Sequence, residues 1–253
     1  MMYDVAIIGC GIIGAATAYE LSRYDLKVVA LEAENDVADG TTKANSAILH
    51  AGYDPEPGTK MARLNVEGVK LAKELCDKLA VERKEIGSFV LAFTDEEMET
   101  VKKLFNRGTK NGVPDMKILT GDEVRAMEPA ISGEVVGALY APSAAIVSPW
   151  EFCIALAETA VVNGVEVRLS AKVESIEKKD SSFLLHTAAG DVEAKYVVNA
   201  AGVEADKVHA MVGGHTFTTT PNRGEYFLLD KAQGGLVNKV VFQCPNPDGK
   251  GVL

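Results

Sequence analysis

Hydrophobic and polar positions at the start of the chain predict a strand, a helix and a second strand. Residues 4–8 form a short, β-branched apolar run that indicates a buried strand, and Gly9 interrupts it. A helix is expected from there to about Arg23, and residues 27–31 predict a second buried strand. This order of elements predicts two parallel strands joined by a helical crossover.

The pattern beyond this unit alternates between amphipathic helices and short apolar strands. Helices are expected over residues 59–79 and 96–111, and Pro149 suits the first position of a helix that runs to Asn163. A further helix is expected to carry His209. Strands are expected over residues 88–93, 135–147 (one or two strands), 166–169, 173–177, 183–187, 192–194, 196–199, 217–220, 225–229 and 237–242.

Composition and charge limit the class of partner. The chain has 253 residues, of which 47% are hydrophobic and 25% charged, as is ordinary for a globular protein with one large domain or two intertwined ones. Its net charge of -10 disfavours nucleic acid, because such binding needs phosphate neutralisation. The uncharged run over residues 5–19 is too short to span a bilayer, which takes about 20 apolar residues. We therefore expect no nucleic-acid partner, no integral membrane segment and a cytoplasmic location, with peripheral membrane contact left open.

The four cysteines are Cys10, Cys76, Cys153 and Cys244, and none forms a C-x-x-C pair. Their spacing fits neither a zinc site, nor a disulfide framework, nor an iron–sulfur cluster. We expect reduced thiols and no bound metal.

Candidate chemistry begins with the motif Gly9-x-Gly11-x-x-Gly14, which follows the first strand and opens the first helix. In that context the first glycine permits a tight turn, the second lets a pyrophosphate approach the backbone, and the third lets helix and strand pack closely. The free N–H groups of the helix N-terminus favour phosphate. Glu32 ends the second strand, where a carboxylate accepts hydrogen bonds from ribose hydroxyls and repels a 2′-phosphate. The motif predicts a site for FAD or NAD rather than NADP.

The course of the chain favours FAD over NAD. An NAD-binding domain normally continues with further strand–helix units. This chain instead leaves through residues 41–53, makes a long excursion and returns at residues 165–202. An NAD-binding protein stays open as an alternative.

Four segments together resemble the D-amino-acid-oxidase-like (DAO) superfamily of FAD-dependent oxidoreductases. They are residues 4–32, 42–53 (Thr-Lys-Ala-Asn-Ser-Ala-Ile-Leu-His-Ala-Gly-Tyr), 197–202 (Val-Val-Asn-Ala-Ala-Gly) and 221–226 (Pro-Asn-Arg-Gly-Glu-Tyr). The pattern is most similar to the glycerol-3-phosphate dehydrogenases and L-2-hydroxyglutarate dehydrogenases of that superfamily, and it covers essentially the whole chain. It departs at Ala47, where many relatives have glycine, and at Lys43, where they often have a small residue.

The resemblance implies an α/β fold in which a FAD/NAD(P)-binding Rossmann-like domain is interwoven with an α+β substrate domain that has an antiparallel sheet. The FAD-binding domain is expected over residues 1–80 and 148–214, and the substrate domain over 81–147 and 215–253. Related enzymes close the FAD domain with a further C-terminal segment. Residues 249–253, which are typical of the approach to another strand, therefore lead us to expect a fragment of a longer protein.

The resemblance also implies contacts with FAD. Residues 42–46 are expected beside the flavin, residues around Val173 near the adenine, and residues 200–202 near the pyrophosphate, where small side chains permit close approach. The expected FAD-binding residues are Gly9, Gly11, Ile12, Ile13, Gly14, Glu32, Ala33, Thr41, Thr42, Lys43, Asn45, Ser46, Val173, Ala200, Ala201 and Gly202.

His50 is the candidate catalytic residue. Oxidation of a secondary alcohol removes a hydride and a proton, and a histidine just beyond the flavin-contact segment can take the proton. Arg223 is a candidate for binding a phosphate or carboxylate, which a guanidinium grips through two hydrogen bonds. Tyr226 is a candidate for placing a hydroxyl in the substrate pocket. Each also has a plainer interpretation, as a structural histidine, a surface arginine and a packing tyrosine.

These residues predict FAD-dependent oxidation of a small 2-hydroxy compound by hydride transfer to flavin N5. The favoured substrate is sn-glycerol 3-phosphate, which gives dihydroxyacetone phosphate. Oxidation of L-2-hydroxyglutarate is the first alternative, and an amino-acid (amine) oxidase is the second. A flavin-binding subunit without dehydrogenase activity belongs to a different class and stays open. Oxygen, a quinone and an iron–sulfur partner protein are all open as electron acceptors.

Overall fold

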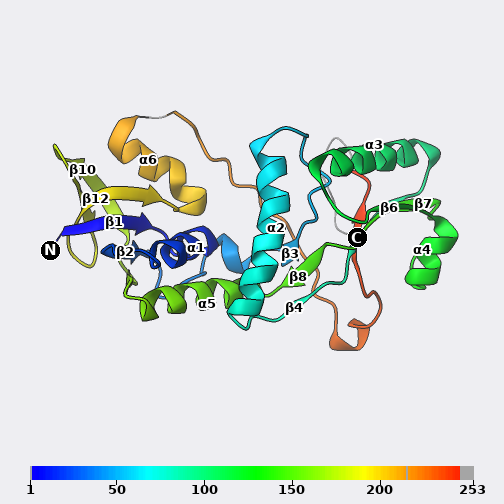
Figure 1. The fold of residues 1–253 in the computed structure, drawn as a ribbon, viewed down its shortest axis with the longest axis horizontal. Helices are drawn as coiled ribbons and strands as arrows, with labels where there is room; N and C mark the ends of the chain where they lie inside the picture. Colours follow the sequence, from blue (N-terminus) through cyan, green and yellow to red (C-terminus); the bar gives the residue numbers. More distant parts are fainter. Residues whose placement is uncertain (1, 215, 246–253) are drawn as a thin grey trace. The chain divides into compact units, whose positions relative to one another are not determined.

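The first apolar run of the chain forms an inner strand of a six-stranded sheet. In the computed structural model, which describes residues 2–214 and 216–245, this strand is β1 (Met2–Ile8). It pairs in parallel with β2 (Val28–Leu31) on one side and with β12 (Val192–Asn199) on the other. The parallel strand–helix–strand unit predicted from the sequence is confirmed (Figure 1).

The remaining strands of this sheet extend it at both edges. Beyond β2 lies β9 (Glu166–Arg168), again in parallel. Beyond β12 lies an antiparallel hairpin made of β11 (Phe183–Thr187) and β10 (Val173–Lys178). The sheet order is β10-β11-β12-β1-β2-β9.

Helices pack on both faces of this sheet, because side chains of β1 are buried alternately on either side. Ile7 lies on the face of α1 (Ile12–Leu21), which also contacts α5 (Pro149–Val162). Ala6 and Ile8 belong to a core cluster with Val208 of α6. The bounds of α6 are Ala205–Gly213, and the helix contacts β10 and β12.

The described chain divides into two compact units, each made of two separate stretches. The first unit combines the residues up to 46 with residues 148–225, and the second combines 47–147 with the residues from 226 onward. The domain boundary expected at residue 80 falls inside the second unit. The reason is α2 (Lys60–Lys78), whose Val66 packs against the core of that unit.

The described part of the second unit contains two small sheets. Its four-stranded sheet has the order β13-β5-β7-β6, and its three-stranded sheet has the order β3-β8-β4. The strand bounds are β3 Ile48–Leu49, β4 Arg83–Lys84, β5 Ser88–Ala92, β6 Lys117–Thr120, β7 Gly137–Ala141, β8 Ala145–Val147 and β13 Val240–Gln243. β5, β6 and β7 pair antiparallel as expected, whereas β13 joins β5 in parallel.

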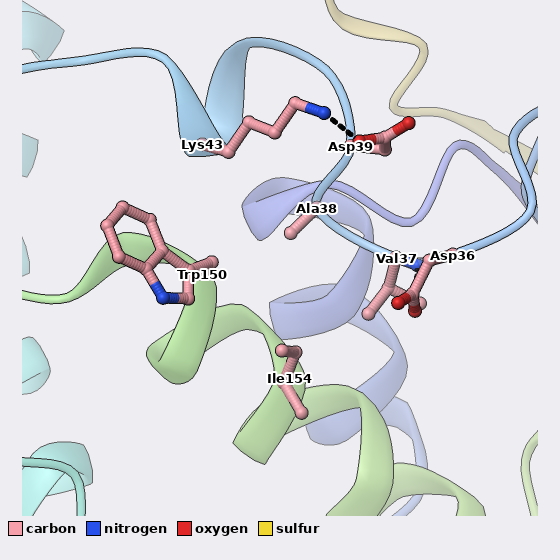
Figure 2. A pocket seen from close by; sticks show the side chains of 7 residues that line it. All are labelled: Asp36, Val37, Ala38, Asp39, Lys43, Trp150 and Ile154. Carbon is pink, nitrogen blue, oxygen red and sulfur yellow. Dashed lines mark hydrogen bonds and ion pairs between the residues drawn. The ribbon is translucent and has the colours of Figure 1, made fainter.

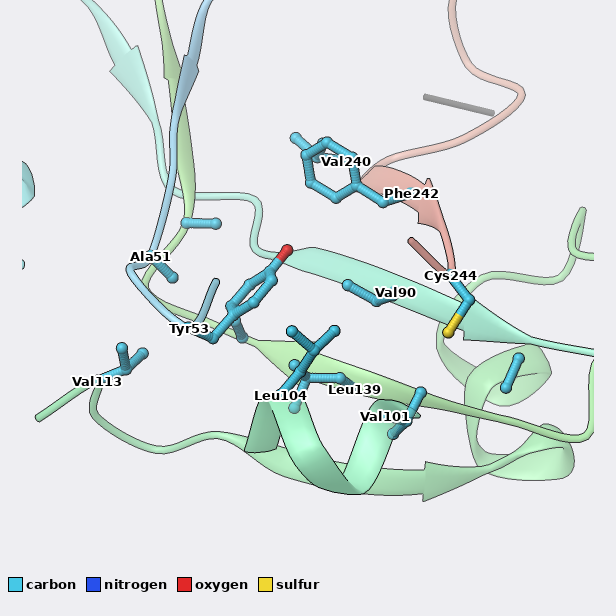
Figure 3. Packing of buried hydrophobic residues seen from close by; sticks show 13 residues of the cluster. Ala51, Tyr53, Val90, Val101, Leu104, Val113, Leu139, Val240, Phe242 and Cys244 are labelled. Atoms are coloured by element: carbon cyan, nitrogen blue, oxygen red, sulfur yellow. The ribbon is translucent and has the colours of Figure 1, made fainter. Parts of the chain in front are cut away.

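The larger core of the second unit lies between the four-stranded sheet and α3 (Asp95–Asn111). Figure 3 shows Leu104 of α3 beside Tyr53 and Leu139, and these three residues belong to one buried cluster with Phe242. A short helix, α4 (Gly121–Met127), follows β6 directly. It begins with a capping box between Thr120 and Glu123.

Two predicted strands are wrong. Residues 217–220 and 225–229 have no regular secondary structure in the described chain. In the first segment the amide of Thr219 donates to the Asp206 carboxylate at 3.0 Å, which holds the backbone in a loop. The second segment lies outside the four-stranded sheet, and its Leu228 is 100% exposed. The expected strand over residues 249–253 lies outside the described residues.

Candidate functional site

The turn between β1 and α1 is packed so closely that only glycine fits at two of its positions. Gly9 has a φ of +95°, and a Cβ there would come within 2.6 Å of the Ala200 carbonyl oxygen. A Cβ on Gly14 would lie 1.9 Å from the Gly9 oxygen. A Cβ on Gly11 would lie 3.0 Å from Oγ1 of Thr42. The turn therefore presents bare backbone, as a bound pyrophosphate requires.

The N-terminus of α1 has the features of an anion site. Its N-cap, Gly11, makes no side-chain capping bond, and its first turn contains no acidic residue. The Ile12 amide donates to Thr42 Oγ1 at 3.0 Å, and Ile13 is 67% exposed. The positive end of the helix dipole is thus free of a competing carboxylate in the first turn.

Glu32 lies at the end of β2, beside the glycine turn. Its Oε2 accepts a 2.6 Å hydrogen bond from the Cys10 amide, and its Oε1 accepts a 3.0 Å bond from the Glu34 amide. Ala33, between these acidic residues, is exposed. A carboxylate has about four lone-pair positions, so Glu32 keeps the capacity to accept further bonds from ribose hydroxyls.

The segment after β2 contains the short 3-10 helix η1 (Thr41–Lys43). Thr42 is buried, and Asn45 donates through Nδ2 to the Thr42 carbonyl at 2.7 Å. Ser46, which ends the first stretch of the first unit, is half-buried. Lys43 points its ammonium at the Asp39 carboxylate, so its charge is already paired (Figure 2).

A hollow of about 420 Å³ adjoins Lys43 (Figure 2). Trp150 and Ile154 of α5 line one side, and the loop after β2 lines the other. The lining residues are Asp36, Val37, Ala38, Asp39, Lys43, Trp150 and Ile154.

A segment far away in the chain lies beside this turn. The Ala200 amide donates to the Ile8 carbonyl at 2.9 Å, which places residues 200–202 beside Gly9. Ala201 is half-buried, and Gly202 has a φ of +56°. Val173, in contrast, lies on β10, three strands away from β1. Its segment reaches Glu32 through the Ala171 amide, which donates to the Glu32 carbonyl at 2.7 Å.

Cys10 links several elements at the turn, a role that the sequence did not predict. Besides its bond to Glu32, Cys10 accepts at its carbonyl from the Ala38 amide at 3.2 Å and from the Cys153 thiol at 3.5 Å. Burial raises the pKa of the Cys10 and Cys153 thiols to about 12. No residue spacing signals these contacts, because they join segments far apart in the chain.

The three candidate catalytic residues are distributed over both units. His50 is exposed in the second unit, and its ring stacks on Phe242 with 5.6 Å between centroids and 27° between planes. Arg223 belongs to the first unit, is 85% exposed at its side chain and forms a 2.6 Å ion pair with Glu225. Tyr226 belongs to the second unit and is 64% exposed.

Residues 2–214 and 216–245 lack two further features. No group of histidine, cysteine, aspartate and glutamate side chains there could hold a metal ion. No helix there is both long and apolar enough to cross a membrane.

Comparisons with known proteins show the family of this chain. Residues 4–253 match the family model described as FAD dependent oxidoreductase, or DAO. The chain is 53% identical over 252 residues to a glycerol 3-phosphate dehydrogenase from Caloramator mitchellensis, covering 100% of this chain and 52% of that protein. It is 33% identical over 250 residues to an L-2-hydroxyglutarate dehydrogenase from Escherichia coli strain K12, covering 97% of this chain and 58% of that protein.

A solved structure shows the same fold. It is a dithionite-reduced L-α-glycerophosphate oxidase from Mycoplasma pneumoniae with FAD bound, and it superposes with a TM-score of 0.85 at 29% identity. The match covers 99% of this chain and 70% of that one. The chain thus spans between half and three-quarters of the length of these relatives. Since the family model matches nearly the whole chain, this protein belongs to the DAO family of FAD-dependent oxidoreductases.

Proposed function

We propose that this protein oxidises sn-glycerol 3-phosphate to dihydroxyacetone phosphate with FAD as its cofactor. The observation that carries the proposal is the 53% identity to the Caloramator mitchellensis dehydrogenase, which extends over the whole of this chain. The open glycine turn is the physical support for the cofactor, because its backbone leaves room that a dinucleotide phosphate needs.

The proposed cofactor site lies in the first unit. The glycine turn and the N-terminus of α1 would bind the pyrophosphate, and Glu32 would accept hydrogen bonds from the ribose. Bound FAD supplies an acceptor for the hydride that leaves the substrate carbon. The further proposed contacts are Ile12, Ile13, Ala33, Thr41, Thr42, Lys43, Asn45, Ser46, Val173, Ala200, Ala201 and Gly202.

In the proposed reaction His50 accepts the proton of the substrate hydroxyl group while the carbon–hydrogen bond is broken. The substrate loses one hydride and one proton, and its secondary alcohol becomes a ketone. A histidine suits this role because its ordinary pKa lies near neutral pH. The neutral form of His50 is therefore the active form in this step.

Arg223 is the proposed ligand of the substrate phosphate. Its guanidinium contacts the Glu225 carboxylate. A bound phosphate would replace this carboxylate as the partner of the guanidinium. Tyr226 follows in the chain and is proposed to place its hydroxyl group near the substrate.

L-2-Hydroxyglutarate is the second candidate substrate, favoured by the 33% identity to the Escherichia coli enzyme. The same reaction would convert it to 2-oxoglutarate, and Arg223 would then bind a carboxylate. The electron acceptor belongs to the proposal as well, since one relative is a dehydrogenase and another an oxidase. Oxygen uptake with substrate in air would identify oxygen as the acceptor.

Anaerobic addition of the two candidates to the full-length, FAD-loaded protein separates them. The proposal predicts that glycerol 3-phosphate bleaches the visible flavin band much faster than L-2-hydroxyglutarate does. It also predicts that Arg223→Ala raises the half-saturating concentration of glycerol 3-phosphate. Faster bleaching by L-2-hydroxyglutarate would replace the proposed substrate, and bleaching by neither would overturn the proposed reaction.

A further inference from the structure

The segment that carries His50 is held by side chains from two helices of the second unit. Asn65 of α2 donates through Nδ2 to the His50 carbonyl oxygen at 2.8 Å. Asn111 of α3 donates through Nδ2 to the carbonyl oxygens of Gly52 at 3.0 Å and Pro55 at 2.8 Å. Two carboxamides therefore fix the backbone at His50 itself and just beyond it.

The same segment packs against these helices without spare room. Gly52 has a φ of +109°, and a Cβ there would lie 2.6 Å from the side chain of Val66 on α2. A Cβ on Gly108 of α3 would lie 2.7 Å from the Cβ of Tyr53. The segment therefore lies in close contact with both helices, which leaves it little room to move.

The buried core of the second unit also holds the segment that carries His50. Ala51 and Tyr53 are 3% and 5% exposed, and Figure 3 shows both in the cluster that contains Phe242. His50, the residue before them, is exposed. The backbone thus enters the core directly after His50.

The His50 ring rests on a part of this core. Phe242 is 4% exposed and lies on β13, which pairs in parallel with β5. Stacking on a buried phenyl ring limits the tilt of the imidazole, while the Asn65 bond limits movement of its backbone. The two contacts therefore restrain different parts of His50, its ring and its backbone.

We propose that Asn65 and Phe242 are positioning residues for His50, which they hold with its imidazole ready to accept a proton. The inference rests on the proposed function, in which His50 takes the hydroxyl proton of the substrate. Neither residue has to touch the substrate. Proton transfer needs a donor–acceptor distance within hydrogen-bond reach, and a displacement of about 1 Å can cost roughly 100-fold in rate.

Asn65→Asp is the sharpest test, because it keeps the size of the side chain and removes the N–H donor. We expect flavin reduction by substrate to slow by about 10- to 100-fold with little change in the half-saturating substrate concentration. Asn65→Gln keeps a carboxamide donor and should restore part of the rate. Asn106→Asp is the matched control, since Asn106 is exposed on α3. It should leave the rate unchanged.

A double variant separates positioning from a general loss of structure. If Asn65 acts through His50, then Asn65→Asp should have no further effect in a protein that already carries His50→Gln. A full additional loss of rate in the double variant would overturn the inference. A normal rate in Asn65→Asp, with His50→Gln impaired, would overturn it as well.

Nuclear magnetic resonance of the histidine Cε1–H groups tests the inference without FAD or substrate. The His50 signal, identified by its loss in His50→Gln, should carry a ring-current shift from Phe242. Phe242→Leu should remove that shift, and Asn65→Asp should move or broaden the signal while His186 and His209 stay unchanged. An unchanged His50 signal in Asn65→Asp would overturn the inference. Absence of flavin bleaching in the wild type would instead overturn the proposed function and leave this readout valid.

Discussion

The amide of Cys10 donates a 2.6 Å hydrogen bond to the carboxylate of Glu32. This bond connects the glycine turn after β1 with the end of the neighbouring strand β2. The Glu34 amide binds the other carboxylate oxygen at 3.0 Å. The orientation of Glu32 is therefore set by two backbone donors, which reduces the entropy cost of binding a ribose there.

Glu32→Gln should weaken FAD binding. A carboxamide can keep one of the two backbone bonds but places an N–H group against the other donor, and bonds to a charged acceptor are worth about 1.5–3 kcal/mol. We expect the dissociation constant for FAD to rise about 10- to 100-fold, measured by titrating apoprotein with FAD. Glu34→Gln is the control, because that side chain is exposed. Equal affinities in the two variants would contradict a role for Glu32 in the cofactor site.

Gly14→Ala should disrupt the glycine turn. The new Cβ would lie 1.9 Å from the Gly9 oxygen, so backbone would have to move. We expect a loss of about 3 kcal/mol in the free energy of unfolding, together with loss of FAD binding. Gly68→Ala on α2 is the matched control, since nothing lies within 4 Å of its Cβ. It should stabilise the helix by about 0.5–1 kcal/mol, and similar effects of both changes in a urea titration would refute the close packing.

The Cys10 and Cys153 thiols should resist alkylation. With the pKa of each raised to about 12 by burial, roughly one thiol in ten thousand is ionised at pH 8. Iodoacetamide followed by peptide mass mapping should label both only after denaturation. The unfolded thiols ionise at lower pH than the folded ones, so these residues should also make the fold less stable as pH rises from about 9 toward 12. Fast labelling of the native protein would contradict their burial.

Glu128 should stabilise the approach to β13. It is 1% exposed, and its carboxylate accepts bonds from the Asn238 backbone at 2.9 Å and from the Asn238 side chain at 3.2 Å. Glu128→Ala removes this buried acceptor and leaves the two Asn238 donors without their partner. The variant should therefore lose about 2–3 kcal/mol in the free energy of unfolding. Glu134→Ala, at an exposed position of the same unit, should cost little. Urea denaturation curves of the two variants that coincide would show that the contact adds no stability.

Elements whose signals lie close together in the chain could be predicted. The helix expected over residues 59–79 is α2, and Thr59 and Leu79 are its two caps. Pro149 does occupy the first turn of α5, after the N-cap Ser148. The glycine turn could also be predicted, because strand, turn and helix follow one another within a few residues.

Elements that depend on distant partners could not be predicted. The apolar residues over 225–229 predict a strand, but that segment lies outside the sheet of its unit. The contacts between Asn65 and His50 and between Glu128 and Asn238 join residues with no periodic relation. One missed element did have a local signal, since the capping box of Thr120 and Glu123 marks the start of α4.

A single-turnover reaction tests the proposed oxidation of sn-glycerol 3-phosphate by FAD. The full-length, FAD-loaded protein is mixed with sn-glycerol 3-phosphate without oxygen, while the flavin band is followed and the product is quantified. We expect the flavin band to bleach and one dihydroxyacetone phosphate to form for each flavin reduced. A protein that retains FAD but shows neither bleaching nor product with this substrate would contradict it.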